Sequence, residues 1–370
     1  MRVLIINSIL YTPTNNQIPK VASVDDCMIL QLAMAFVKQG HDVTLVAAKE
    51  YEPTTPSRLP LRIIYLPSAL TWLFKPSLLP FHPQLMRFLR KHKHHFDWII
   101  SSELFSLNSL LAACMAPDKT IVWNEQGKHN RKYFRLPSWI WYNIVARLLM
   151  RNVKVVARSP IASRFVRRFG MKVSSVIIDH GIDRQLFHPQ HEKEPFFMVS
   201  ARLDADKNVI SLLMKYKQYA ESYPDRPCRF YIAGSDGGEL PRLKQYVCDN
   251  RLDGQIRFLG RISSSEMASC LRRSICLLCD SKKESNMISI NEAIVSGTPV
   301  ITNTVPFGHE QIRQYQLGIA KENWTAEDMY EVVTNNAFYV ENCLRYAPQL
   351  YLSKVPDKFM QAFHEDTPRQ

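Results

Sequence analysis

Two glutamates in the second half of the chain stand eight residues apart, at a place where carboxylates can hold a ligand. Glu284 follows the apolar run SICLLCDS, and Glu292 lies inside the next predicted helix, which the stretch SGTPVI ends. Free amides at a helix start and the helix dipole favour a phosphate, and carboxylates accept hydrogen bonds from sugar hydroxyls. We therefore expect Met287, Ile288 and Ser289, at the helix start, to hold a phosphate between the two glutamates.

Two cations occupy an equivalent place after another predicted strand. Arg202 and Lys207 lie in SARLDADKN, directly after the run FFMVS. Cations just beyond a strand end suit an anionic ligand. A solvated pair of loop charges is the alternative that this pattern leaves open.

Short apolar runs alternate with helical stretches from end to end, which is typical of parallel βαβ units. A helix is predicted over Met28–Gln39, where apolar residues recur at helical spacing. The strands expected in the first half are Arg2–Ile6, Val43–Ala47, Leu61–Leu66, Trp98–Ser101, Thr120–Trp123, Val153–Ala157 and Ser175–Ile178. Those expected in the second half are Phe196–Val199, Phe230–Ala233, Ile256–Leu259, Ile275–Leu278 and Pro299–Thr302.

These runs predict an α/β protein with two doubly wound, Rossmann-like domains. The stretch HGIDRQLFHPQHEKEP, with two prolines and little periodicity, marks the boundary. We expect domains over residues 1–180 and 181–345, and a tail over 346–370 that packs back on the first domain. Such sheets bind ligands beyond the carboxyl ends of their strands.

The net charge of +13 is confined to the first half. Residues 1–180 contain 24 Lys and Arg against 10 Asp and Glu, whereas residues 181–370 contain 23 against 24. This asymmetry predicts an anionic partner for the first half, and a generic basic surface is the alternative. A nucleic-acid partner has only the charge in its favour, because no recognition motif is present.

No apolar run approaches the roughly 18 residues that a membrane-spanning helix needs. The N-terminus MRVLIINSIL is typical of a first strand rather than a signal peptide, so we expect a cytoplasmic protein. Cys276 and Cys279 form a C-x-x-C inside an apolar run, and we expect both thiols in a buried strand rather than in a metal or redox site.

Two basic stretches rich in aromatic residues, Thr71–Lys93 and Asn130–Arg151, suit an interface with lipid. The alternative is a helix core with a solvated basic face. The membrane-surface candidates are Trp72, Phe74, Arg87, Arg90, Lys91, Arg131, Lys132, Arg135 and Trp139.

Three residues of the first half are candidates for handling an acceptor substrate. Glu125 and His129 follow the strand TIVW, and Lys20 lies after the first strand. A histidine whose ring is simply packed at the surface is the alternative for His129.

The second half resembles the retaining glycosyltransferase family 4, which has the GT-B fold. The resemblance rests on the turn HGID, on SARLDADKN, on YIAGSDGGELPRLK, on FLGRISSSEM and on ESNMISINEAIVSGTPVI, which occur in the order of the family. They cover most of the stretch from Ser175 to Asn303, while the first half is matched mainly by its strand order and by VVARSPIA.

This resemblance implies that the first domain binds the acceptor and that the second domain binds the donor, across a cleft between them. Glu284 would bind hydroxyls of the donor sugar, Glu292 the ribose, and Arg202 and Lys207 the departing diphosphate. Gly234, in the strand and glycine turn, would lie at the nucleotide. The family needs no metal and no cofactor, which is consistent with two fixed cations at the diphosphate.

The resemblance implies a cytoplasmic hexosyltransferase that binds peripherally to the inner face of the cytoplasmic membrane. It would move a sugar from a nucleotide diphosphate to a glycan acceptor, one linked to a polyprenyl diphosphate, in bacterial surface polysaccharide or glycoconjugate assembly. Two alternatives stay open, namely an enzyme acting on a soluble small acceptor and a degenerate subunit that only binds nucleotide sugar.

Overall fold

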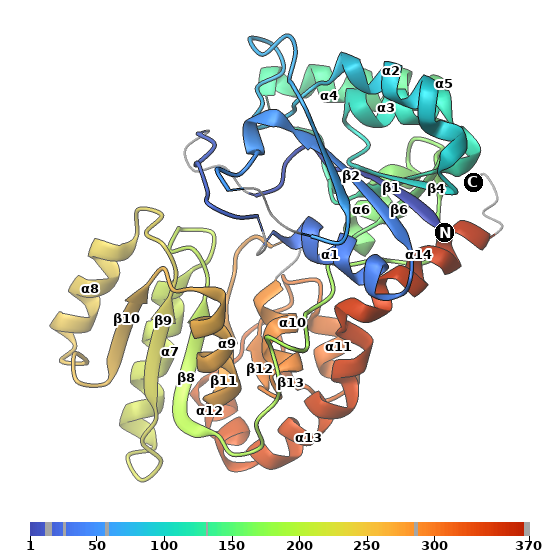
Figure 1. Ribbon diagram of the computed structural model, residues 1–370. Helices are drawn as coiled ribbons and strands as arrows, with labels where there is room; N and C mark the ends of the chain where they lie inside the picture. The colour runs from blue at the N-terminus through green and yellow to red at the C-terminus, as the bar shows by residue number, and fades with distance from the viewer. Residues whose placement is uncertain (12–16, 25–26, 56–58, 131, 285–287, 366–370) are drawn as a thin grey trace. The chain divides into compact units, whose positions relative to one another are not determined.

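A computed structural model describes residues 1–11, 17–24, 27–55, 59–130, 132–284 and 288–365 (Figure 1). The chain forms two compact units. Unit 1 comprises Met1–His180 and a C-terminal segment that begins at Leu352, and unit 2 comprises Gly181–Tyr351. The chain thus changes unit between His180 and Gly181, and it returns at Leu352 rather than at residue 346.

Unit 1 is built on a parallel sheet of seven strands in the order β3-β2-β1-β4-β5-β6-β7. The strands are β1 (Arg2–Ile6), β2 (Asp42–Ala48), β3 (Arg62–Leu66), β4 (Trp98–Ser102), β5 (Thr120–Asn124), β6 (Lys154–Ala157) and β7 (Lys172–Val173). The strand order reverses direction at β1 and β4, which is where open α/β sheets place ligands.

Helices cover both faces of this sheet, as a doubly wound sheet requires. They are α1 (Met28–Lys38), α2 (Pro83–His92), α3 (Leu107–Met115), α4 (Leu136–Ile140), α5 (Arg147–Leu149), α6 (Pro160–Arg167) and α14 (Val355–His364). Val3 and Ile5 point to the face covered by α1 and α14, which contact each other (Figure 1). Leu4 and Ile6 point to the opposite face, beneath α2 and α3, as alternation along a strand dictates.

The prediction of a strand over Ser175–Ile178 is wrong. β7 is a two-residue strand that ends before it, and the chain beyond makes isolated hydrogen bonds, such as Ile178 N to Ala157 O at 3.0 Å. The amide of Ser175 donates to the Glu365 carboxylate at 2.9 Å. That donor is therefore used by a side chain of the C-terminal segment and not by a neighbouring strand.

Unit 2 has a second parallel sheet, of six strands in the order β10-β9-β8-β11-β12-β13. Its strands are β8 (Glu194–Ser200), β9 (Arg229–Ala233), β10 (Ile256–Gly260), β11 (Ser274–Cys279), β12 (Val300–Thr302) and β13 (Gly318–Ala320). Its helices are α7 (Val209–Ser222), α8 (Leu240–Asp249), α9 (Ser264–Arg273), α10 (Ile288–Val295), α11 (His309–Gln314), α12 (Ala326–Thr334) and α13 (Asn336–Tyr346). The predicted architecture of two parallel-sheet, Rossmann-like units is confirmed.

The strand β13 was not expected from the sequence, because its three residues are too short for a periodic signal. Gly318 makes it possible, since a Cβ at this position would lie 2.1 Å from the carbonyl oxygen of Val300. The prediction that Cys276 and Cys279 lie in a buried strand is confirmed, because both are buried in β11.

The core of unit 1 predicts a stability role for α14. The Phe359 ring is fully buried, with its centroid 5.9 Å from that of Phe36 and 5.6 Å from that of Trp123. Removing a buried phenylalanine leaves a cavity, so Phe359→Ala should lower the free energy of unfolding by about 3–5 kcal/mol. Urea unfolding followed by circular dichroism measures this, with the exposed Gln361→Ala on the same helix as control. Equal unfolding midpoints for the two variants would contradict the assignment of α14 to this core.

Candidate functional site

An ion pair joins two loops at the carboxyl edge of the unit 2 sheet. Lys207 lies in the loop after β8, and its ammonium group donates to Oε2 of Glu284, in the loop after β11. The two side chains retain only 22% and 10% of their exposure. Because β8 and β11 are neighbours in the sheet, residues that are 77 apart in the chain meet at one point.

Further contacts hold these two loops together. The Lys283 ammonium lies 2.8 Å from the Asp206 carboxylate, and the amide of Lys282 donates to the carbonyl of Asp206 at 2.8 Å. Asn208, whose backbone has a left-handed φ of 53°, donates through Nδ2 to the carbonyl of Asp280 at 3.2 Å. The position of Glu284 is therefore fixed by the loop that carries Lys207.

Asp280 also belongs to this site, although it was not predicted from the sequence. Its buried carboxylate accepts hydrogen bonds from Ser211 Oγ at 2.6 Å, from Lys215 Nζ at 2.9 Å and from Asn303 Nδ2 at 3.2 Å. Lys215 also lies 3.9 Å over the ring of Trp324. The position of Asp280 directly after β11 is the sequence signal that could have identified it.

Arg202 contacts a different carboxylate and is largely exposed. Its guanidinium contacts the Asp204 carboxylate, with Nη2 at 2.6 Å and Nε at 2.7 Å. The same carboxylate accepts the amides of Asp206 and Lys207 at 3.1 and 3.2 Å. Asp204 thus shapes the loop, and Arg202, whose side chain is 68% exposed, is open to an anion in solvent.

The helix α10 carries the other expected ligand residues. Met287 lies outside the described residues. Ile288 packs against the apolar core of unit 2, and Ser289 Oγ donates to the carbonyl of Ser200 at 3.2 Å, which ties the start of α10 to the end of β8. Burial raises the pKa of Glu292 to about 7, so this carboxyl lies in a place that penalises its charge.

Gly234 follows β9 and is required by a close approach of two backbones. A Cβ at this position would lie 1.7 Å from the carbonyl oxygen of Ala201, at the end of β8. The need for glycine here is therefore explained within unit 2 itself, and a role at a nucleotide stays a prediction.

Unit 1 has its own polar cluster at the carboxyl edge of its sheet. Glu125, one residue beyond β5, accepts a hydrogen bond from Nη1 of Arg158, one residue beyond β6, at 2.9 Å. The buried Arg158 guanidinium lies 3.7 Å over the ring of Trp123, and its Nη1 lies 3.1 Å from Nε2 of His180. Burial and the neighbouring Arg158 lower the pKa of His180 to about 3, so the neutral imidazole accepts this hydrogen bond.

Glu103 completes the cluster, one residue beyond β4. Its backbone has a left-handed φ of 68°, a costly conformation for a residue with a Cβ. Its carboxylate accepts the amides of Glu125 at 3.0 Å and of Gln126 at 3.3 Å, and burial raises its pKa. Of this cluster, only Glu125 was predicted as a site residue. Glu103 and Arg158 each lie one residue beyond a strand, which is the signal that could have identified them, and His180 begins the HGID turn.

The remaining acceptor candidates differ from Glu125. The His129 ring is packed against Phe165, with 5.1 Å between centroids, and against Tyr142 and Phe169, and its Nδ1 lies 3.1 Å from Ser138 Oγ. Burial lowers its pKa. These contacts are those of a packed ring, which was the alternative reading of His129. Lys20 is exposed.

The membrane-surface candidates fall into three groups. Trp72, Arg87, Arg90, Lys91, Arg135 and Trp139 are exposed. Phe74 is half-buried, with its ring 5.8 Å from that of Phe81. Arg131 and the side chain of Lys132 lie outside what the structure describes.

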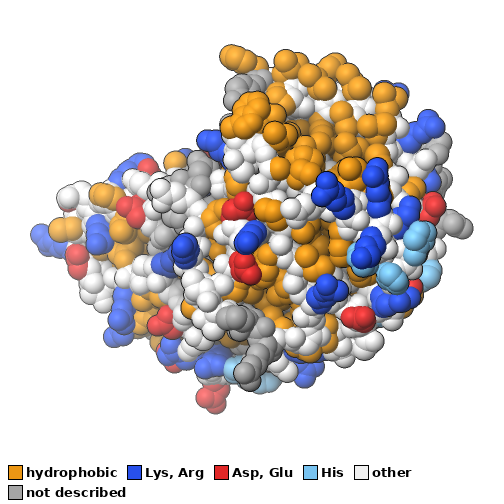
Figure 2. All heavy atoms as spheres, turned by 45° about the horizontal axis from the view of Figure 1, so that its top comes forward, with side chains coloured by type: hydrophobic (Ala, Val, Ile, Leu, Met, Phe, Trp, Pro, Cys, Tyr) orange, Lys and Arg blue, Asp and Glu red, His pale blue; other side chains and the backbone are white. Residues whose placement is uncertain are grey.

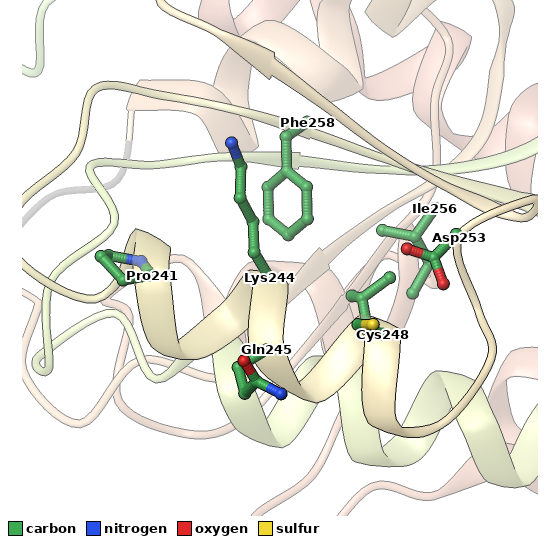
Figure 3. Close-up of a pocket in the computed structure, with 8 residues that line it drawn as sticks. Pro241, Lys244, Gln245, Cys248, Asp253, Ile256 and Phe258 are labelled. Carbon is green, nitrogen blue, oxygen red and sulfur yellow. The ribbon is translucent and has the colours of Figure 1, made fainter.

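A groove of about 540 Å³ lies between α8 and β10, where Lys244, Cys248 and Phe258 are among its walls (Figure 3). It contains none of the residues expected to bind a substrate. The polar groups at the carboxyl edges of the two sheets therefore remain the candidate site.

Comparison with known sequence families identifies the class of this protein. Residues 28–186 match the family described as Glycosyltransferase Family 4, and residues 183–335 match the one described as Glycosyl transferases group 1. Together the two matches run through both units. The chain belongs to glycosyltransferase family 4.

Individual relatives share part of this chain. The O-antigen chain mannosyltransferase RfbU of Salmonella typhimurium is 27% identical over 36% of this chain and 36% of its own length. Alpha-monoglucosyldiacylglycerol synthase of Streptococcus pneumoniae is 24% identical over 49% of this chain and 44% of its own length. The matches thus span less than half of these curated relatives.

Solved structures support the fold over nearly the whole chain. A glycosyltransferase from Rickettsia africae superposes with a TM-score of 0.72 at 14% identity, over 98% of this chain and 97% of that one. Anabaena HepE in complex with UDP superposes with a TM-score of 0.69 at 14% identity, over 98% and 99%. The GT-B fold is therefore confirmed.

A separate finding concerns membranes. In the part of the chain that the structure describes, every helix is too short or too polar to cross a bilayer.

The raised pKa of Glu292 predicts a pH dependence of stability. The folded protein holds a proton on this carboxyl up to about pH 7, whereas an ordinary glutamate loses it near 4.5. The stability of the wild-type protein should therefore fall as the pH rises from about 4.5 to 7, by on the order of 1–3 kcal/mol from this group. Glu292→Gln removes the charge, so its stability relative to wild type should improve between pH 5 and pH 8 in urea unfolding. The same difference at both pH values would show that Glu292 is not destabilised by burial.

Proposed function

We propose that this protein is a retaining glycosyltransferase that moves a hexose from a nucleotide diphosphate sugar to a glycan acceptor. The Lys207–Glu284 ion pair at the carboxyl edge of the unit 2 sheet carries the proposal. It brings a cation suited to a diphosphate and a carboxylate suited to sugar hydroxyls to one point, as the donor requires. The structure of HepE with UDP supports a nucleotide ligand for this fold.

The residues have distinct roles in this proposal. Glu284 binds hydroxyls of the donor sugar, and Glu292 binds the ribose. Lys207 and the exposed Arg202 neutralise the diphosphate, on which charge grows as the bond to the sugar breaks. Fixed cations that meet this growing charge accelerate the reaction more than they tighten substrate binding. The reaction then needs no metal ion.

The ribose assignment is consistent with the environment of Glu292. Its carboxylate is poorly solvated, which is what raises its pKa. Two ribose hydroxyls would return the hydrogen bonds that burial takes away, at about 1.5–3 kcal/mol for each bond to a charged group. Nucleotide binding would thus stabilise the ionised form.

For the acceptor we propose a glycan linked to a polyprenyl diphosphate, presented at the cytoplasmic face of a bacterial membrane. The basic charge of residues 1–180 supports an anionic surface or an anionic lipid as partner of unit 1. Two curated relatives, an O-antigen mannosyltransferase and a glucosyldiacylglycerol synthase, bear names that concern surface polysaccharide and glycolipid. Glu125 is the acceptor candidate that we retain, because Arg158 holds it with its side chain 45% exposed.

A soluble small acceptor and a degenerate binding subunit are the rival functions. The presence of Glu284, Glu292, Arg202 and Lys207 disfavours the degenerate subunit, because such a protein has no need for all four. A soluble small acceptor would not account for the basic charge of unit 1, which disfavours that function.

Transfer can be tested with labelled UDP-, GDP- and TDP-sugars and a bacterial membrane fraction as acceptor. We expect labelled product that partitions into butanol and is released by mild acid, as a sugar on a polyprenyl diphosphate would be. Turnover should be unchanged by EDTA. Lys207→Ala should lower kcat on the order of a hundredfold, the scale for removing one group that stabilises transition-state charge, with a smaller change in KM.

Three outcomes would each overturn a different part. Loss of turnover with EDTA and its rescue by Mg²⁺ would overturn the metal-free reaction. Product that stays in the aqueous phase would favour the soluble acceptor. Nucleotide binding without turnover on any acceptor fraction would favour the degenerate subunit.

A further inference from the structure

Exposed apolar side chains of the described residues are concentrated in unit 1. The segment from α4 to α5 exposes Leu136, Trp139, Ile140, Ile144, Leu148 and Leu149 to between 40% and 64%. The loop before α2 exposes Leu70, Trp72 and Leu73, with Trp72 at 77%. Figure 2 shows hydrophobic side chains gathered over a broad area of the molecule. Apolar patches of this kind on a folded protein mark a surface that is covered by something else.

The α4–α5 segment has two opposite rows of residues. Ser138, Tyr142, Ala146 and Met150 follow at four-residue spacing and are buried, at 1%, 0%, 0% and 0% exposure. They form the inner row.

The outer row has the same spacing. Leu136, Ile140, Ile144 and Leu148 run through α4, a π-helical turn over Trp141–Ala146 and α5, at 58%, 40%, 47% and 64% exposure. A helix on the surface of a globular protein normally carries polar residues on its outer face. Here the outer row is entirely apolar, so it is not explained by packing within unit 1.

The charge of the residues around the outer row indicates what covers it. From Gln126 to Ile178 the sequence contains Lys and Arg throughout but no Asp or Glu. Arg135, Arg147 and Arg151, around the outer row, are exposed. An apolar row flanked by arginines fits the interface of an anionic bilayer, where apolar side chains enter the acyl region and guanidinium groups stay at the headgroups. A second copy would bring the same positive charge into contact with itself.

The second exposed stretch is held at the same part of unit 1. Asn108, in α3, donates to the carbonyl of Pro80 at 2.9 Å and accepts the amide of His82 at 3.1 Å, which anchors the loop that carries Trp72. Trp141 of the π-helical turn donates to the carbonyl of Leu104 at 2.8 Å. Both stretches are therefore attached to the few residues from Leu104 to Asn108.

We infer that the outer row of the α4–α5 segment inserts into an anionic lipid bilayer, with the Trp72 loop as a second anchor. This inference extends the proposed function. It rests on that proposal only for the purpose of the membrane binding, which would be to place the enzyme at a lipid-linked acceptor. Attraction by basic residues alone would be abolished by salt, since the Debye length falls to about 3 Å at 1 M. Insertion of an apolar row adds a part of the binding that salt does not remove.

The test uses the full chain and co-sedimentation with vesicles of phosphatidylethanolamine with phosphatidylglycerol, or of phosphatidylcholine alone. Wild-type protein should bind the anionic vesicles at low salt and retain part of this binding at 1 M salt. Ile144→Gln/Leu148→Gln should weaken the binding at least tenfold and abolish the salt-resistant part. Met214→Gln/Phe338→Gln, in unit 2, changes two apolar side chains of similar exposure, 48% and 50%, and should bind as wild type does.

Several results would overturn the inference. They are equal binding by both double variants, no binding to anionic vesicles, or binding that 1 M salt abolishes completely. A wild-type dimer that only Ile144→Gln/Leu148→Gln converts to a monomer would show that a second copy covers the row. Thermal unfolding of each variant checks that it is folded, which the exposure of all four positions leads us to expect.

Failure of this inference and failure of the proposed function are distinguishable. Transfer activity without vesicle binding would refute insertion and leave the glycosyltransferase proposal standing. Vesicle binding without any nucleotide binding would refute the glycosyltransferase proposal and leave the insertion standing.

Discussion

The ion pair between Lys207 and Glu284 is the contact on which the candidate donor site depends. Each residue belongs to a loop that follows a different strand. A cation left without its partner in a poorly hydrated place is strongly destabilised. The pair therefore stabilises both loops in one arrangement, and Asp206 with Lys283 and Asn208 with Asp280 reinforce it. The pair holds Lys207 and Glu284 at one point, where a bound diphosphate would become a second anionic partner of Lys207.

Unit 1 uses the same principle with different residues. Arg158 is buried over Trp123 and holds Glu125, while the strained Glu103 fixes the following backbone through two amides. Both clusters lie just beyond neighbouring parallel strands, because that is where such a sheet brings distant parts of a chain together. The rigid strands keep each set of side chains in place, which a catalytic site requires.

Much of the fold could be predicted from the sequence. The apolar residues of the predicted strands Arg2–Ile6 and Ile275–Leu278 are buried on both faces of their sheets, so a continuous apolar run was enough to predict each strand. Two short stretches could not be predicted. β13 depends on a close approach at Gly318, and the stretch after β7 depends on Glu365 from the far end of the chain. Both are tertiary effects that local pattern does not contain.

The site shows the same division. Positions after strands were enough to name Glu284, Arg202 and Lys207, and Glu292 could be named from its place in the next helix. Their partners could not be named. Asp280 and Arg158 act through hydrogen bonds to residues distant in sequence, and the packing of His129 against three aromatic rings needs the folded chain. The outer apolar row of α4 and α5 is likewise visible only once the inner row is known to be buried.

The central claim is that Lys207 binds the diphosphate of the donor, and calorimetric titration with UDP and with GDP tests it most directly. The matched control is Lys282→Ala, which removes an exposed lysine side chain from the adjoining loop and keeps the backbone amide that donates to Asp206. For the nucleotide that wild type binds, Lys207→Ala should weaken the affinity at least tenfold, while Lys282→Ala should leave it close to the wild-type value. Equal affinity of Lys207→Ala and wild type would contradict the account.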